Sequence, residues 1–93
     1  MKDLVKGQLV CSKAGRDKTQ YFAVVDFAPG RVLVADGQRY TLDDPKPKNP
    51  AHLAPTSTVL PAAALSNDQQ LAAAVEAFRQ TAGAGTEEDR KLV

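Results

Sequence analysis

The chain has 93 residues, of which 43% are hydrophobic, which is enough for one small core and too little for two. Its formal net charge of +1 lacks the strong positive excess that is typical of nucleic-acid binders. The charge is unevenly distributed, however, because the chain up to Thr56 has nine basic and six acidic residues and the remainder three basic and five acidic ones.

Two runs rich in β-branched and aromatic residues predict the first two strands, Gln8 to Lys13 and Gln20 to Phe27, with Gly15 in the loop between them. Side chains alternate between the two faces of a strand. In the second run, one face carries Tyr21, Ala23, Val25 and Phe27, and the other carries Phe22, Val24 and Asp26. We expect the first of these to be the core face.

A third strand is predicted from Arg31 to Ala35, after the turn Ala28-Pro29-Gly30. Asp36-Gly37 is a strong hairpin signal, so a fourth strand is expected from Gln38 to Leu42, with Tyr40 and Leu42 pointing inward. Four short strands within about forty residues favour a strongly bent antiparallel sheet or a small barrel.

Four prolines interrupt the pattern between Asp43 and Pro55. Because proline lacks a backbone donor and disfavours helix before it, we expect an extended loop across the barrel surface. Ser57 to Leu60 is a candidate fifth strand that closes the barrel.

The last third of the chain predicts an amphipathic helix from about Asn67 to Thr81. Ser66 followed by Gln69 fits a capping box, and apolar residues then recur at helical spacing, namely Leu71, Ala74, Val75 and Phe78. Gly83-Ala84-Gly85 is expected to be a joint. The predicted organisation is therefore a barrel in residues 1–60, a helical extension in 61–83 and a flexible tail in 84–93.

The residues for nucleophilic or metal chemistry are sparse. The chain has one histidine, His52, and one cysteine, Cys11, without a spacing that links them, and a structural zinc site takes four such ligands. Asp43-Asp44 is more typical of a solvated turn than of an acid–base pair. We expect no enzyme activity, no catalytic residue, no cofactor and no metal.

A single cysteine excludes an intramolecular disulfide, and nothing in the composition indicates an oxidising compartment. Neither a signal peptide nor a membrane span is predicted, because the apolar runs are too short. We therefore expect a cytoplasmic protein without a membrane partner.

The loop from Lys13 to Lys18 is the first candidate binding site. Its three cations, Lys13, Arg16 and Lys18, can converge on a phosphate backbone, and Gly15 allows the chain to approach a ligand closely. The alternative is a hydrophilic hairpin loop without a ligand.

A second basic segment follows, in which Lys46 and Lys48 alternate with prolines and are displayed from a stiff, extended chain. Together with Arg39 and His52 they would extend the same surface. The alternative is edge protection, since lysine and proline blunt the exposed edge of a sheet.

Tyr21 and Phe22 follow the basic loop and also have two interpretations. They could stack on an unpaired base, or at least one of them could belong to the core.

The run from Lys6 to Val25 resembles a KOW motif, with Lys6 to Val10, Gly15 and Arg16-Asp17-Lys18 where the family has them. Four separated segments resemble short bacterial KOW domain-containing RNA-binding proteins, which are similar to KOW-bearing large-subunit ribosomal proteins of archaea and eukaryotes. These segments are Ser12 to Lys18, Ala35-Asp36-Gly37, Pro45 to Lys48 and His52-Leu53. Two positions differ from the family: Thr19 replaces a usual glycine, and Asn49-Pro50-Ala51 is less basic.

This resemblance implies an SH3-like barrel, RNA binding, and association with ribosomes or translation. The expected fold is mainly β, a small SH3-like (KOW) antiparallel β-barrel with a C-terminal amphipathic α-helix. The expected partner is ribosomal or other structured RNA, bound without catalysis. The candidate RNA-binding residues are Lys13, Arg16, Lys18, Arg39, Lys46 and Lys48, with a weaker case for His52.

A protein–protein interaction module is the alternative function. The barrel, or the apolar stripe of the helix formed by Leu71, Val75 and Phe78, would then dock a protein partner. Against this, the same stripe could pack on its own barrel.

Overall fold

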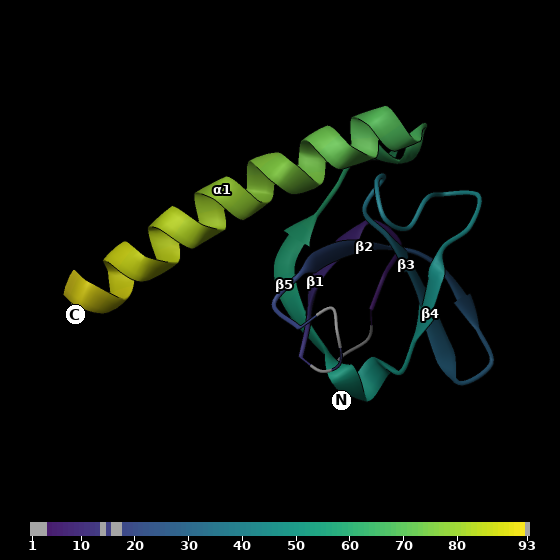
Figure 1. The fold of residues 1–93 in the computed structure, drawn as a ribbon, viewed down its shortest axis with the longest axis horizontal. Helices are drawn as coiled ribbons and strands as arrows, with labels where there is room; N and C mark the ends of the chain where they lie inside the picture. The colour runs from purple at the N-terminus through teal and green to yellow at the C-terminus, as the bar shows by residue number, and fades with distance from the viewer. Residues whose placement is uncertain (1–3, 14, 16–17, 93) are drawn as a thin grey trace.

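Five strands form one curved antiparallel sheet in the part of the chain that the computed structural model describes, residues 4–13, 15 and 18–92, with the backbone alone for 82–92. The strands are β1 (Gln8–Ser12), β2 (Tyr21–Ala28), β3 (Arg31–Ala35), β4 (Lys46–Lys48) and β5 (Leu53–Val59). Their order across the sheet is β4-β3-β2-β1-β5 (Figure 1). No pairing between these described strands joins the two edges, β4 and β5, so the sheet is not closed into a barrel.

A short connection forces this sheet to curl. The edge strands β4 and β5 are consecutive in the sequence and are joined only by Asn49 and the 3₁₀ turn η2 (Pro50–His52). Four strand spacings would separate the edges of a flat sheet by about 19 Å, whereas this linker spans at most about 14 Å. The two edges must therefore bend toward each other.

Both faces of the sheet are buried, and β2 contributes to each. On the concave face Phe22 and Val24 pack with Val10, Val32, Val34 and Leu53. The other face presents Leu9, Ala23 and Ala35 to the C-terminal helix.

The prediction of a single core face for the second strand was therefore only partly correct. Phe22 and Val24, which the prediction placed on the other face, are buried, whereas Phe27 is 46% exposed. The register of β2 against β3 shifts between Val24 and Asp26, and this bulge breaks the simple alternation toward the end of the strand.

Helix α1 (Asp68–Leu92) lies across the convex face with its N-terminal part (Figure 1). Its residues Leu71 and Val75 are buried against the sheet. The ring of Phe78 meets that of Tyr21 edge-on, with 5.2 Å between centroids. The apolar stripe thus packs on its own sheet.

The two ends of α1 differ from the prediction. The side chain of Asn67, rather than Ser66, caps the helix by accepting the Gln70 N–H at 2.8 Å, while the Ser66 hydroxyl donates to the Ala63 carbonyl. The helix also continues past Thr81 to Leu92. Gly83 and Gly85, predicted as a joint, lie within this helix, although each glycine costs about 1 kcal/mol relative to alanine. No helix within the described residues is long and apolar enough to cross a lipid bilayer.

The predicted fourth strand, Gln38 to Leu42, is not formed. The Asp36 carboxylate accepts the N–H groups of Gln38 and Tyr40, at 3.0 and 3.1 Å, and closes a turn. The Leu42 N–H donates to the Asp68 carboxylate at 2.8 Å. These backbone donors are therefore satisfied by side chains instead of by a neighbouring strand.

The fourth strand comes from the segment predicted as a loop. Lys46–Lys48 pairs with β3, with Lys48 opposite Val32 and Lys46 opposite Val34. The fifth strand was placed correctly but begins earlier than predicted, at Leu53. Proline is compatible with both strands because both lie at a sheet edge.

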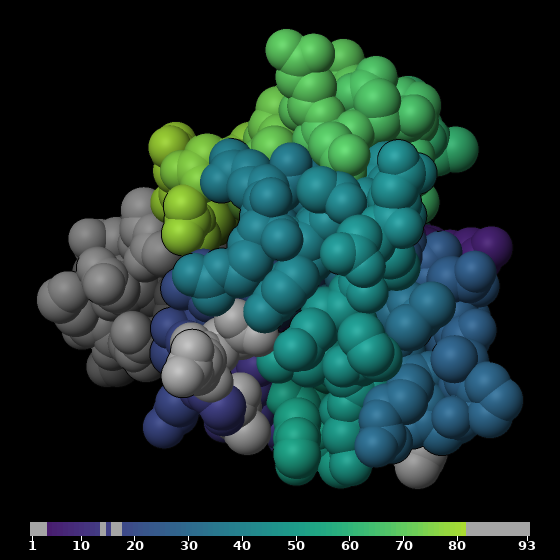
Figure 2. Space-filling model, turned by 45° about the vertical axis from the view of Figure 1, so that its right-hand side comes forward, coloured from purple at the N-terminus to yellow at the C-terminus, as the bar shows by residue number. Residues whose placement is uncertain are grey.

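Gly37 fixes the approach of α1 to the sheet. Segment 36–45, blue-green in Figure 2, lies directly under the first turns of the helix. Gly37 has a φ of 81°, and a Cβ atom there would stand only 2.7 Å from the backbone nitrogen of Ala72. The backbone of the helix thus occupies the space that the Cβ atom of any other residue at position 37 would need.

We predict that Gly37→Ala lowers the free energy of unfolding by about 2–4 kcal/mol, because left-handed strain adds to a clash with backbone. Gly30→Ala is the matched control, since Gly30 has a φ of 72° and nothing within 4 Å of its Cβ position. Its free energy of unfolding should fall only by the cost of the left-handed strain, about 1–2 kcal/mol. Urea denaturation measures both variants, and equal losses would contradict the close approach.

Candidate nucleic-acid interface

The β1–β2 loop is closed at its base by backbone hydrogen bonds. Ser12 donates its N–H to the Gln20 carbonyl at 2.9 Å, and Thr19 donates its N–H to the Ser12 carbonyl at 2.8 Å. Further out, the Lys18 N–H donates to the Gly15 carbonyl at 3.2 Å. The loop is therefore a continuation of the hairpin.

Two of the three predicted cations of this loop, Lys13 and Lys18, are described, and both are exposed. Arg16 lies outside the described residues. The Lys13 N–H donates to the His52 carbonyl at 2.8 Å, which places the start of the loop beside η2 (Figure 1). The basic loop and the end of the proline-rich segment are thus neighbours.

Thr19 has a left-handed backbone, with a φ of 70°, and is the only non-glycine residue with a positive φ in the described ranges. A β-branched residue rarely adopts this conformation, which costs about 1–2 kcal/mol. Thr19 is one of the two positions at which the sequence differs from the KOW motif that it resembles. Glycine would adopt this backbone conformation without strain.

We predict that Thr19→Gly raises the free energy of unfolding by up to about 1 kcal/mol, because relief of the strain outweighs the larger chain entropy of glycine. Gln20→Gly serves as the control, because Gln20 does not have a positive φ. That variant should be destabilised by about 0.5–1 kcal/mol. A destabilised Thr19→Gly, measured by thermal unfolding, would argue against stored strain at this position.

Lys46 and Lys48 lie over aromatic rings at the edge strand. The Nζ of Lys46 is 5.6 Å from the ring centroid of Tyr40, and the Nζ of Lys48 is 6.0 Å from that of Phe22. The two ring centroids are 5.7 Å apart, so the four side chains form one group, the lysine–ring cluster. A cation–π contact at an exposed site contributes about 0.5–1 kcal/mol, enough to bias where each ammonium lies.

The predicted cations therefore fall into two groups. Lys13 and Lys18 belong to the loop beside η2, whereas Arg39 is exposed and immediately precedes Tyr40 of the lysine–ring cluster. Only Asn49 lies between β4, which carries Lys46 and Lys48, and η2, so one short stretch of chain links the two groups.

The aromatic pair after the basic loop does not form an open stacking platform. Phe22 is only 1% exposed and belongs to the concave core. Tyr21 is half-buried, with its ring against Phe78. The core interpretation is correct for Phe22.

Reactive groups are few in the described residues. Burial raises the pKa of the Cys11 thiol, so the thiol stays protonated at neutral pH and is a poor nucleophile. No three His, Cys, Asp or Glu side chains gather there as metal ligands. His52 is exposed in η2 and donates its backbone N–H to the Asn49 carbonyl at 2.9 Å.

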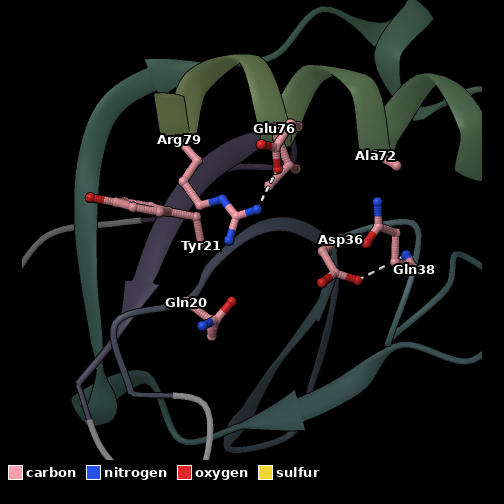
Figure 3. Close-up of a pocket in the computed structure, with 8 residues that line it drawn as sticks. Gln20, Tyr21, Asp36, Gln38, Ala72, Glu76 and Arg79 are labelled. Carbon is pink, nitrogen blue, oxygen red and sulfur yellow. Dashed lines mark hydrogen bonds and ion pairs between the residues drawn. The ribbon is translucent and has the colours of Figure 1, made fainter. Parts of the chain in front are cut away.

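The sequence did not reveal a small pocket between α1 and the sheet (Figure 3). Its volume is about 60 Å³. Its polar lining comes from three distant parts of the chain: Gln20, Asp36 and Gln38, and Glu76 and Arg79. No periodicity or motif connects these positions, because only the docking of α1 brings them together.

No protein-family model matches the chain, and no curated protein is significantly similar to it. The function must therefore be inferred from the geometry of the two basic groups and from the residues that resemble the KOW motif.

Proposed function

We propose that this protein is a non-catalytic RNA-binding protein of the KOW type that acts in the cytoplasm on ribosomal or other structured RNA in translation. The proposed interface consists of Lys13, Arg16 and Lys18 in the β1–β2 loop and Arg39, Lys46 and Lys48 near the edge strand. The scaffold would be an SH3-like barrel that is left open between β4 and β5.

The topology supports this scaffold. β1 to β4 form a continuous meander, and β5 returns to pair with β1 on its other side. Since η2 limits the distance between the ends of the two edge strands to about 14 Å, the sheet bends in the direction that closure into a small barrel would require.

One observation carries the proposal, the 2.8 Å hydrogen bond from the Lys13 N–H to the His52 carbonyl. It ties the basic loop to the segment that continues from Lys48, so cations far apart in the sequence can face one ligand. Nucleic-acid affinity arises mainly from several cations that neutralise phosphates together, and a single exposed lysine adds little.

The left-handed Thr19 supports the KOW assignment of the loop. A strained β-branched residue persists only where the surrounding structure demands that conformation. Here the hydrogen bonds at the base of the β1–β2 loop impose that conformation, and they hold Lys13 and Lys18 in the same short loop.

The protein-interaction alternative has less support. Its candidate surface on the helix is occupied, because Leu71 and Val75 are buried and Phe78 contacts Tyr21. A partner would have to displace α1 from the sheet in order to reach them.

We predict that Lys13→Ala with Lys18→Ala weakens binding to a structured RNA at least several-fold. Each phosphate contact adds about 0.7–0.9 to the slope of log K against log salt, so losing two should reduce that slope by about 1.4–1.8. Fluorescence anisotropy at several salt concentrations measures both quantities.

The matched control is Lys6→Ala with Arg31→Ala, which removes the same charge. Lys6 precedes β1 and Arg31 begins β3, so both lie at the strand ends away from the β1–β2 loop. This pair should bind nearly as wild type. Equal effects of the two pairs would mean that net charge, and no defined site, drives binding.

Ribosome association has its own test. Native protein should co-sediment with ribosomal particles at low salt and be released as the salt rises. If it remains in the supernatant at low salt, the ribosome is not its target, and a salt-sensitive complex with other structured RNA would then define the function.

A further inference from the structure

The pocket between α1 and the sheet is small and is lined by side chains from both elements. Ala72 and Val75 line it from the helix, and Tyr21 lines it from the sheet. Its volume is about 60 Å³, and it opens to solvent beside the exposed side chains of Gln20, Gln38 and Arg79. The pocket is small, so we expect it to admit no more than one flat group.

The guanidinium of Arg79 is held over this pocket. Figure 3 shows it directed from α1 toward the cavity, beside Tyr21. Glu76 pairs with it one turn away, and Gln80 donates to the other oxygen of Glu76 at 3.1 Å. These two hydrogen bonds lower the pKa of Glu76, so the carboxylate stays ionised and remains the acceptor for Arg79.

The charges of the pocket oppose an ionic ligand. An anion would meet two carboxylates, Asp36 and Glu76, against one guanidinium that is already paired. A cation would find Asp36 engaged with the backbone N–H groups of Gln38 and Tyr40. A neutral, flat, hydrogen-bonding group meets neither obstacle.

Two exposed glutamines supply hydrogen-bond donors and acceptors for such a group. Gln20 and Gln38 both line the pocket, and each side-chain amide offers donors and an acceptor. Unpaired bases of RNA are read through these groups on their edges, while their faces stack on aromatic rings or guanidinium planes. Gln20 and Gln38 provide the hydrogen-bonding groups, and the guanidinium of Arg79 provides a plane on which a base could stack.

Two residues that line the pocket are close in sequence to the cations proposed to bind phosphates. Gln20 comes two residues after Lys18, and Gln38 immediately precedes Arg39. A base in the pocket would thus have a candidate phosphate contact next to each glutamine.

We propose that this pocket accepts one unpaired nucleobase of the bound RNA and gives the protein a preference for looped-out or single-stranded positions. This rests on the proposed RNA-binding function. The basic groups would hold the phosphates, and the pocket would select where along the RNA the protein sits.

The test uses a stem–loop RNA whose loop carries one abasic site at successive positions, with binding measured by anisotropy. Wild-type protein should lose about tenfold in affinity when the base at one position is missing and little at the others. Gln20→Ala with Gln38→Ala should bind the intact RNA about tenfold more weakly and no longer distinguish the abasic position.

Gln69→Ala with Gln70→Ala is the matched control, because both residues are exposed on α1 and do not line the pocket. It should behave as wild type. Gln38→Glu provides a second variant of nearly the same shape that lacks the amide donor and adds a third carboxylate, and it should also lose the discrimination.

The outcomes separate the two proposals. If wild-type protein binds the RNA but is insensitive to every abasic site, or if the pocket variants keep the discrimination, the pocket proposal is overturned and the phosphate interface remains. If wild-type protein does not bind structured RNA at all, both proposals are overturned.

Discussion

The docking of α1 on the convex face of the sheet is the interaction on which the rest of this structure depends. Gly37 lets the helix backbone approach, and the Asp68 carboxylate accepts the Leu42 N–H. Leu71 and Val75 then cover Ala23 and Ala35, which would otherwise face water. A single layer of five short strands buries one face only, so the helix supplies the second layer that a small domain needs.

Local chemistry determined what could be predicted from the sequence. The first three strands follow from β-branched runs and turn residues, and the helix from its apolar period. The strand predicted for residues 38–42 does not form, because the carboxylates of Asp36 and Asp68 accept backbone N–H groups of this segment that a neighbouring strand would otherwise bind. That competition involves a residue 26 positions distant from Leu42 and is invisible to any local pattern.

The candidate site was predictable to a similar extent. Exposure of Lys13 and Lys18 follows from a polar hairpin loop, and the alternation of Lys46 with Lys48 places both on one face of a strand. Their contacts with Tyr40 and Phe22 depend on the curvature that η2 imposes. The pocket depends on helix docking, and thus on tertiary structure alone. The sequence therefore predicted which charged residues are displayed but not which of them lie near one another.

The pairing of β5 with β1 has a consequence for the nascent chain. β1 is complete once Ser12 has been made, yet its second neighbour exists only after residues 53–59 follow. Until then one side of a strand carrying Leu9 and Val10 has unpaired backbone groups, which are a template for association with other chains. Helix α1 is synthesised later still, so the convex face stays uncovered throughout. During synthesis β1 therefore precedes both the strand that pairs with it and the helix that covers its face.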